Sequence, residues 1–249
     1  MTPMGNEGRV VDMSAILLTG RITGKTGRRD GGDAGCGQNG PVVILQPTLD
    51  LWDGAVPRPG HRDRVVADSA DRLAWLRARA RGITATDAAR LSGPGSIRPL
   101  LREKMLGSGF GGNAYTDHGR AREPEIAAWI RAEHGILPST LLFHAAVDRR
   151  HLATPDGVLV TEAGQVLLAE IKTTNKAWRG IPKHYLRQVW WQQYVMDAER
   201  TLLVWEQHED FVPVSAEPQC RWIDRDEAEI AKLVLLAGQL LAAMDGTGR

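Results

Sequence analysis

The chain has 249 residues, of which 43% are hydrophobic and 24% are charged, and these values are ordinary for a globular protein. Its two cysteines, Cys36 and Cys220, are too few for a disulfide framework, a zinc cluster or a four-cysteine iron–sulfur site. No apolar stretch approaches the ~18 residues of a membrane span, and the apolar run at residues 16–18 is too short for a signal peptide. We therefore expect a reduced cytoplasmic protein that does not bind membranes.

The net charge of +1 hides a strong segregation of charge along the chain. Residues 71–104 carry eight Lys or Arg against three Asp or Glu, whereas residues 197–229 carry ten acidic side chains against three basic ones. This segregation favours one surface that meets polyanions and another that does not. The alternative is that the charges only cover solvated helices.

Residues 1–65 differ from the remainder, because they are rich in glycine and show no sustained helical period. We expect a flexible or loosely packed arm there, with one short strand at residues 42–45, followed by a folded domain over residues 66–249. The Gly-Arg-Ile-Thr-Gly-Lys-Thr sequence at residues 20–26 has three residues between its glycines, whereas a phosphate loop needs four. We therefore reject it as a nucleotide site.

The apolar spacing from about residue 64 predicts a helix that ends at Gly82. Thr84-Ala85-Thr86-Asp87 predicts the start of the next helix, with Thr84 or Thr86 as its N-cap. Exposed N–H groups and hydroxyls beside Arg79 and its neighbouring arginines would suit a phosphate. Ordinary capping with solvated arginines explains the same residues and is favoured when no other evidence is considered.

Residues 117–119 lead into a predicted helix that reaches about His134, with Pro124 near its first turn or at a kink. Glu123 and Glu125 would then lie at the helix start, where the helix dipole favours carboxylates. That position fully explains one of the two acids and leaves the other available as a metal ligand.

Thr154-Pro155-Asp156-Gly157 opens a predicted strand at residues 157–161, which a tight turn at Ala163-Gly164 joins to a strand at residues 165–173. Depending on the loop length, Asp156 lies opposite Ile171 or opposite Glu170. In either register the two acids can reach one ion, and Glu170 shares its strand face with Lys172. Two carboxylates and a lysine arranged in this way can hold Mg²⁺ beside a phosphate and place a water for attack.

The remaining chain predicts a loop at residues 174–182, a helix at residues 183–198, strands at residues 201–207 and 219–223, and a final helix at residues 225–244. On the first of these helices, His184, Gln188 and Gln192 form a polar stripe, and the adjacent tryptophans are interpreted as packing residues. Asp224 and Glu227 predict a capping box for the last helix.

Four segments in this order, Glu123, Pro155-Asp156, Glu170-Ile171-Lys172 and Gln188, resemble the PD-(D/E)XK nucleases. More specifically, residues 71–210 resemble the YqaJ viral recombinase branch, which includes phage lambda exonuclease. The resemblance implies an α/β fold with a restriction-endonuclease-like core, in which helices flank a mixed central sheet. Thr86 stands where serine is commoner in that branch, and Asp148 fits a further family acid only imperfectly in spacing.

The resemblance also implies roles for individual residues. Asp156, Glu170, the Ile171 carbonyl and Glu123 would bind Mg²⁺ or Mn²⁺, and Lys172 would orient the attacking water or stabilise the transition state. Gln188 and Tyr185 would position the water or the scissile strand. The predicted contacts to DNA or to a terminal 5′-phosphate are Arg79, Thr84, Thr86, Thr154 and Tyr185.

The implied activity is Mg²⁺-dependent 5′–3′ exonuclease action on linear duplex DNA in phage-type recombination, in the host cytoplasm if a phage encodes the chain. The implied partners are DNA ends, a single-strand annealing protein and further copies of the chain in a trimer. Three alternatives stay open: a RecB-like or endonucleolytic enzyme of the same superfamily, a non-catalytic DNA-binding subunit with the same fold, and an α/β domain with chance acids. A RecB-like enzyme often carries four clustered cysteines, which this chain lacks.

Overall fold

The structure is a computed structural model that describes residues 60–106 and 112–247. The predicted strand at residues 42–45, the rejected phosphate-loop segment and most of the predicted arm lie outside these residues. Residues 60–65, which we assigned to the arm, belong to the described fold, and Arg64 is buried and donates to the Met196 carbonyl at 3.2 Å. None of the helices in the described ranges is both long and apolar enough to cross a bilayer.

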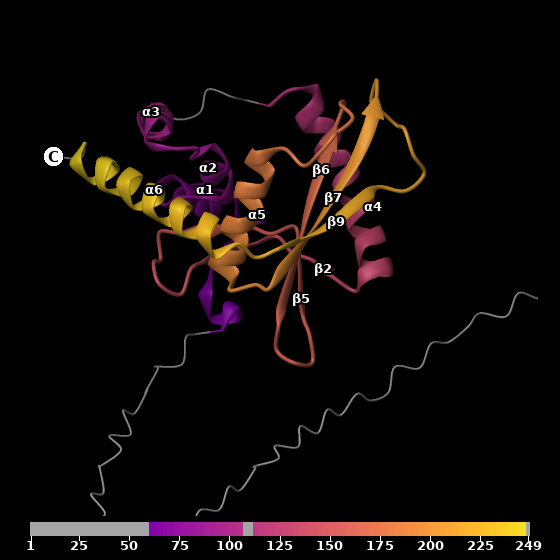
Figure 1. Cartoon of the computed structure of the whole chain (residues 1–249), viewed down its shortest axis with the longest axis horizontal. Coiled ribbons are helices and arrows are strands. Elements are labelled where there is room, and N and C mark those ends of the chain that lie inside the picture. Colours follow the sequence, from indigo (N-terminus) through magenta and orange to yellow (C-terminus); the bar gives the residue numbers. More distant parts are fainter. Residues whose placement is uncertain (1–59, 107–111, 248–249) are drawn as a thin grey trace, which may run out of the picture. The chain divides into compact units, whose positions relative to one another are not determined.

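The elements follow one another as a mixture of helices and strands (Figure 1). The helices are α1 (Arg72–Arg81), α2 (Ala85–Arg90), α3 (Ile97–Leu106), α4 (Ala114–His134), α5 (Lys183–Met196) and α6 (Glu227–Gly246), with short 3₁₀ turns η1 (His61–Arg64) and η2 (Pro94–Ser96). The strands are β1 (Val65–Asp68), β2 (Leu137–Pro138), β3 (Leu141–His144), β4 (Leu152–Ala153), β5 (Gly157–Val160), β6 (Val166–Thr174), β7 (Arg200–Glu209), β8 (Val212–Pro213) and β9 (Gln219–Asp224).

The main sheet is mixed, with strand order β2-β5-β6-β7-β8 and with β9 also paired to β7. β5 and β6 form an antiparallel hairpin, whereas β6 and β7 run parallel, so α5 makes the crossover between them. A second, small sheet has the order β1-β3-β4. This arrangement confirms the predicted α/β class with a mixed central sheet.

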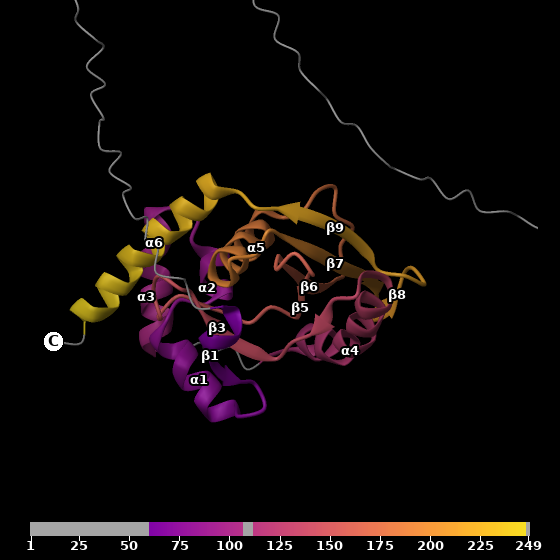
Figure 2. The same cartoon turned by 90° about the horizontal axis from the view of Figure 1, so that it is seen from below.

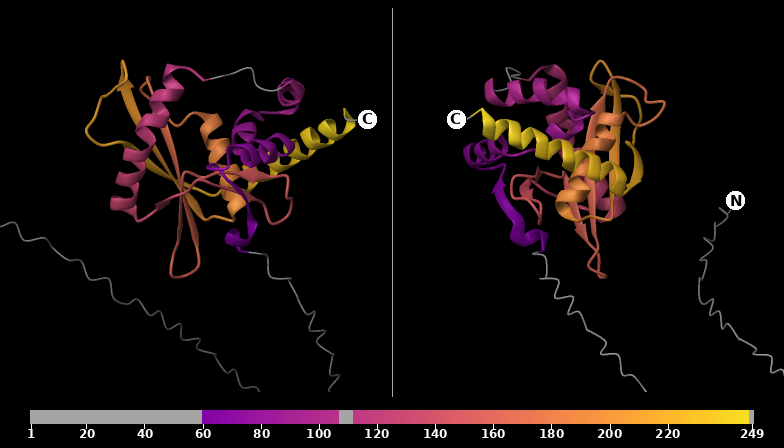
Figure 3. Two further views of the ribbon diagram at one scale, coloured as in Figure 1. Left: turned by 180° about the vertical axis from the view of Figure 1, so that it is seen from behind. Right: turned by 60° about the vertical axis from the view of Figure 1, so that its left-hand side comes forward.

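Helices cover both faces of the main sheet (Figures 1 and 2). On one face, Ile126 and Ile130 of α4 pack against Ala169 and Ile171 of β6. On the other face, α5 packs over Leu168, and behind α5 lie α2, α3 and α6. Because strand side chains alternate, Glu170 and Lys172 point to the α5 face with Leu168. The view from behind shows the β5–β6 hairpin projecting away from α6 (Figure 3).

The prediction of a helix from about residue 64 is wrong for its first part. Val65–Asp68 is the strand β1, which pairs antiparallel with β3, and the helix begins only at Arg72, where Asp71 accepts from the Ala74 N–H at 3.1 Å. Adjacent β-branched residues at positions 65 and 66 suit a strand, and pairing with β3 overrides a weak helical period. The predicted helix end at Gly82 is confirmed.

Two predicted helix starts are also wrong. α4 begins at Ala114, because the Asn113 side chain accepts from the Thr116 N–H at 3.0 Å and caps the helix there. Pro124 therefore lies inside α4, and the helix dipole does not explain Glu123. In α6 the N-cap is Asp226, which accepts from the Glu229 N–H, and Asp224 belongs to β9 instead.

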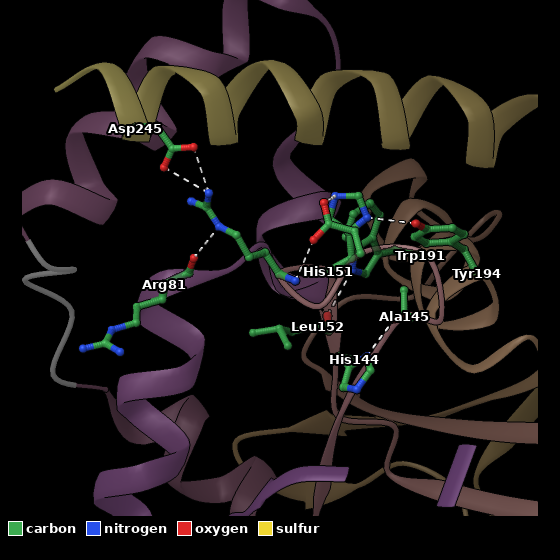
Figure 4. A network of polar contacts seen from close by, with 10 residues as sticks. Arg81, His144, Ala145, His151, Leu152, Trp191, Tyr194 and Asp245 are labelled. Carbon is green, nitrogen blue, oxygen red and sulfur yellow. Dashed lines mark hydrogen bonds and ion pairs between the residues drawn. The ribbon is translucent and has the colours of Figure 1, made fainter. Parts of the chain in front are cut away.

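Polar contacts fix the segment that leads to Asp156 (Figure 4). Trp191 of α5 donates its indole N–H to the Leu152 carbonyl at 3.0 Å, and the Tyr194 hydroxyl lies 2.9 Å from Nδ1 of His151. Both contacts tie β4 and the residue before it to α5. The backbone shortly before Asp156 is therefore held in place by α5.

Candidate active site

The β5–β6 hairpin brings Asp156 beside Glu170. Its pairs run from Val160↔Val166 to Gly157↔Ala169, which is the predicted register that sets Asp156 opposite Glu170. Just past the last pair, the Asp156 N–H donates to the Ala169 carbonyl at 3.1 Å, and the Asp156 carboxylate accepts from the Ile171 N–H at 2.7 Å. The N–H and the carboxylate of Asp156 thus bind the two residues that flank Glu170 in β6.

Glu170 is 2% exposed, and side chains from the same face of the sheet bind both of its carboxylate oxygens. Lys172 and Gln188 donate to Oε1, and Gln192 donates to Oε2 at 2.6 Å. Gln188 was predicted from sequence as a site residue, and Gln192 was not. The signal for Gln192 was the polar stripe at i, i+4 and i+8 on α5, which directs both glutamines toward one point on β6.

This cluster brings two neighbouring carboxyl groups, Asp156 and Glu170, beside one ammonium, that of Lys172. Burial raises the pKa of Asp156 well above its ordinary value, and the nearby Glu170 carboxylate raises it further. Burial lowers the pKa of Lys172, but the attraction of Glu170 and Asp156 outweighs burial and leaves that pKa raised. Lys172 is therefore a cation that offsets one of the two carboxyl groups, and a further cation would offset the charge of the second and favour the ionised form of Asp156.

The oxygen atoms around this cluster suit a hard divalent cation. The Ile171 N–H points to Asp156, and since the N–H and C=O of a strand residue point to the same side, the Ile171 carbonyl does so too. The Asp156 and Glu170 carboxylates and this carbonyl are the ligand types that Mg²⁺ and Mn²⁺ prefer. Within the described ranges, no three His, Cys, Asp or Glu side chains gather closely enough to form a metal-binding cluster by themselves.

Glu123 lies at the rim of this site. It shares a cavity of about 400 Å³ with Ile171 and Lys172, although it belongs to α4 on the opposite face of the sheet. Burial of its carboxyl group raises the pKa of Glu123, and the charge of Glu170 adds to that rise. Glu123 is thus near enough to sense Glu170 and is exposed enough to meet a ligand in the cavity.

Aromatic rings hold Lys172 on its other side. The Lys172 ammonium lies 5.2 Å from the centre of the Tyr185 ring, and Tyr185 in turn contacts Trp178, with 5.2 Å between ring centres. Trp178 stacks on Trp205 of β7 at 5.1 Å. The predicted site residue Tyr185 therefore acts on the lysine that faces the carboxylates.

A second cavity, of about 410 Å³, lies where α1, α2 and α3 meet. Its lining includes Arg79, Thr84 and Thr86, as predicted, together with Asp87 and two basic residues that were not predicted, Arg90 and Lys104. Lys104 lies 2.8 Å from Asp87 and offsets its charge. Sequence reasoning did not include Lys104, because α3 brings it to Asp87 from 17 residues along the chain.

The two predicted threonines in this cavity have different roles. Thr84 is 3% exposed and forms a capping box with Asp87, whose N–H donates to the Thr84 hydroxyl at 3.2 Å. Thr84 is therefore the N-cap of α2, and its hydroxyl is committed within the protein. Thr86 is exposed, so its hydroxyl can meet a ligand.

The remaining predicted DNA contact, Thr154, is half-buried two residues before Asp156. Its hydroxyl oxygen is closed off from solvent and has no hydrogen-bond partner among the described residues. Its contact with DNA stays a prediction. The cavity at α2 and the carboxylate cluster are joined through α5, because Arg187 of α5 donates to the Ala89 carbonyl at 2.8 Å while the next residue, Gln188, binds Glu170.

Comparisons with known proteins agree with this arrangement. A family model for the YqaJ-like viral recombinase domain matches residues 74–199. No curated protein sequence matches this chain at a significant level. Among solved structures, the alkaline exonuclease LHK-Exo from Laribacter hongkongensis superposes with a TM-score of 0.54 at 24% identity, covering 70% of this chain and 92% of that one.

Two further structures show the same fold. LHK-Exo in complex with dAMP gives a TM-score of 0.55 at 24% identity, again with 70% and 92% coverage. A phage-related exonuclease from Haemophilus somnus 129PT gives a TM-score of 0.51 at 12% identity, covering 68% of this chain and 96% of that one.

Proposed function

Because this chain belongs to the YqaJ-like viral recombinase domain family, we propose that it is a metal-dependent exonuclease that degrades linear duplex DNA from a 5′ end. It is a nuclease, a hydrolase that acts on DNA, with the fold of the alkaline and phage-related exonucleases. LHK-Exo forms a complex with dAMP, and a deoxynucleoside monophosphate is the unit that an exonuclease releases. Metal dependence, direction and mechanism are the parts that we propose.

One observation carries the proposal. Glu170 is buried beside Asp156, and Lys172, Gln188 and Gln192 bind its oxygens directly. A carboxylate with a purely structural role rarely needs three donors and a second acid beside it. Buried charged groups at the end of an apolar strand are typical of functional sites. A non-catalytic DNA-binding subunit has no use for this cluster.

Different residues of the site would bind the metal ion and stabilise the transition state. Asp156, Glu170 and the Ile171 carbonyl would hold a divalent cation, with Glu123 at its open side. When bound, such a cation lowers the pKa of its water and neutralises charge on the phosphate. Lys172, fixed as a cation, donates hydrogen bonds to the scissile phosphate or the attacking water and stabilises the charge that develops.

The glutamines and Tyr185 orient these groups. Gln188 and Gln192 fix the rotation of the Glu170 carboxylate, which sets the direction of its free lone pairs. Tyr185 keeps the Lys172 ammonium at the cluster through a cation–π contact of 5.2 Å. The two glutamines and Tyr185 thus position other groups, whereas Lys172 acts on the phosphate itself.

The cavity at α2 supplies the preference for an end. In this cavity Arg90 pairs with Glu103 at 2.6 Å, and Lys104 pairs with Asp87 at 2.8 Å. Arg79 therefore supplies the positive charge beside the open Thr86 hydroxyl, and this combination suits a terminal 5′-phosphate. Arg79 also lies 4.1 Å from the centre of the Trp75 ring, which fixes its guanidinium. A second candidate function, endonucleolytic cutting, would not need this cavity.

Digestion of paired DNA substrates tests the proposal. With Mg²⁺, we expect a 5′-phosphorylated linear duplex to be degraded to mononucleotides, a 5′-hydroxyl duplex to be degraded more slowly, and a closed circle to stay intact. EDTA should stop all degradation. Cutting of the circle at the linear rate would identify an endonuclease, and no cutting with Mg²⁺ or Mn²⁺ would identify a non-catalytic DNA-binding subunit.

The family resemblance also implies a ring-forming trimer and a single-strand annealing partner. Sedimentation velocity of the full chain, with and without linear duplex DNA, tests the first of these. A sedimentation coefficient that corresponds to a trimer supports the ring, and one that corresponds to a monomer contradicts it.

A further inference from the structure

Two exposed aromatic side chains lie against each other beside the carboxylate cluster. Tyr115, in the first turn of α4, is 51% exposed, and Phe211, between β7 and β8, is 41% exposed. Their ring centres are 5.2 Å apart. Single exposed aromatics are common, but a contacting pair of partly exposed rings is suited to receive another flat, apolar group.

This pair is continuous with the active site. Tyr115 lines the cavity that contains Glu123, Ile171 and Lys172, and it also lines a neighbouring cavity of about 340 Å³ that contains Phe211. The second cavity falls within the range of small-ligand sites, roughly 300–1,000 Å³. A strand bound with its phosphate at Lys172 would therefore reach Tyr115 directly.

The floor beneath the two rings is built from buried, fixed groups. Phe211 stacks on His208 at 5.5 Å with an angle of 18°, and His208 packs edge-on against His118 at 4.4 Å. Next to them, Nε and Nη2 of Arg122 donate to the two carboxylate oxygens of Glu206, at 2.9 and 2.8 Å. Phe211 is thus held in place rather than free to turn away.

One further feature of this floor indicates a ligand. His208 is 2% exposed, lines the cavity, and has a buried Nδ1 with no hydrogen-bond partner in the described part of the chain. Asp210 and Phe211 have φ values of 47° and 67°, the left-handed pair that a two-residue hairpin loop between the paired residues Glu209 and Val212 requires. This turn fixes the place of Phe211 above His208.

The charges around the rings give the direction of a bound strand. The exposed side chains Lys176 and Arg179 line a third cavity, of about 510 Å³, which Tyr115, Tyr185 and His208 also line. Glu209 and Asp210 lie on the far side, next to Phe211. Phosphates would be attracted to the lysine and arginine and repelled by the two acids, so a base would point toward Phe211.

We propose that Tyr115 and Phe211 form a stacking subsite for one unpaired base of the DNA strand bound at the carboxylate cluster, with the phosphates of that strand along Lys176 and Arg179. The inference rests on the proposed function for its substrate, DNA. Aromatic rings beside a basic loop are the general means of binding single strands. Bases inside a duplex already stack on each other, so the subsite takes a base only where the duplex has opened.

Binding of abasic oligonucleotides tests the subsite. In EDTA, the full chain is titrated with single-stranded oligodeoxynucleotides of one length, each lacking the base at one successive position. For the wild-type protein we expect loss of one base, or of two adjacent bases, to weaken binding by roughly tenfold, with little effect elsewhere. Phe211→Leu and Tyr115→Leu should weaken binding of the intact oligonucleotide and flatten this profile.

Matched variants separate stacking from a change in fold. Phe211→Tyr and Tyr115→Phe keep a ring and should keep the position-specific loss, and Val212→Ala changes an exposed apolar neighbour that lines none of these cavities and should also keep it. A flat wild-type profile, or leucine variants with the wild-type profile, would overturn the subsite; a surface used by a protein partner gives that flat result.

The nuclease proposal fails or stands separately. Digestion of linear duplex by a wild-type protein with a flat profile would leave the nuclease intact and remove the subsite. A protein that digests nothing in Mg²⁺ or Mn²⁺, yet shows a position-specific loss that Phe211→Leu abolishes, would keep the subsite and remove the nuclease.

Discussion

Ionisation of the Asp156 carboxyl group destabilises the folded state in the metal-free protein. The reason is that burial and the nearby Glu170 carboxylate raise the pKa of Asp156. The sign follows from the shift: stability is fully present below the unfolded pKa of an aspartate and is lost as the pH rises through the higher folded pKa. A bound divalent cation would remove this cost.

We therefore expect Asp156→Asn to unfold at a higher temperature than the wild type at pH 8 without metal, because asparagine does not ionise and can still accept from the Ile171 N–H. Mg²⁺ or Mn²⁺ should raise the unfolding temperature of the wild type but not of the variant. Thermal unfolding with and without metal measures both. Equal stabilisation of the two proteins by metal would remove Asp156 from the ligand set.

Gln192 allows a second test at the scale of a residue. It binds Glu170 Oε2 at 2.6 Å, and loss of such a partner of a metal ligand typically costs about 10–100-fold in metal affinity or activity. Gln192→Leu should raise the Mg²⁺ concentration for half-maximal hydrolysis by about that factor. Gln193 is an adjacent, equally buried control that binds Thr201 and the Ile223 carbonyl instead, so Gln193→Leu should lower stability without changing the Mg²⁺ requirement.

At the scale of elements, the hairpin that presents Asp156 depends on a close approach at Gly157. A Cβ at this position would lie 2.9 Å from Ile136 Cγ2 and 3.1 Å from the Ala169 Cβ, so Gly157→Ala forces neighbours apart. Overpacking of this kind costs about 1–3 kcal/mol.

Gly238, inside α6, is the matched control, because a Cβ there meets nothing within 4 Å. Alanine in a helix interior is favoured over glycine by about 0.5–1 kcal/mol, so Gly238→Ala should stabilise the protein. Urea unfolding of both variants measures the difference. A neutral Gly157→Ala would show that β5 can shift away from β2 and β6 without cost.

The elements also show where sequence reasoning succeeds and where it stops. The β5–β6 hairpin and α5 were predicted nearly to their ends, because alternation, a turn and a helical period are local signals. The start of α4 was not, since capping by Asn113 lay outside the segment considered helical. That error assigned Glu123 to a helix start, whereas the structure places it mid-helix at the rim of the site.

At the scale of the whole molecule, the candidate site combines segments that are far apart in sequence. The carboxylates and Lys172 could be predicted, because one hairpin carries them and their spacing defines their faces. The partners that complete the site could not. Gln192 meets Glu170 only because α5 packs across the sheet, and Lys104 meets Asp87 only because α3 folds onto α2.

The two parts of the site, cutting and end recognition, should be separable by mutation. Arg79→Gln should abolish the preference for 5′-phosphorylated over 5′-hydroxyl ends, while hydrolysis of 5′-hydroxyl ends continues. Arg77 is exposed on the same helix, does not line the cavity and serves as a control of equal charge, so Arg77→Gln should keep the preference. Rates on the two duplexes measure this. An unchanged preference in Arg79→Gln would show that this cavity does not recognise the 5′-phosphate.

The central claim is that Lys172 acts chemically on DNA bound at the Asp156 and Glu170 carboxylates. Single-turnover hydrolysis of a 5′-phosphorylated linear duplex in Mg²⁺, with duplex binding measured in EDTA, tests this claim on Lys172→Met. Lys232→Met, which changes an exposed lysine of α6, is the control. We expect hydrolysis by Lys172→Met to fall by about 10²–10³-fold, as for loss of one transition-state donor, with binding preserved. Hydrolysis by this variant at the wild-type rate would contradict the account.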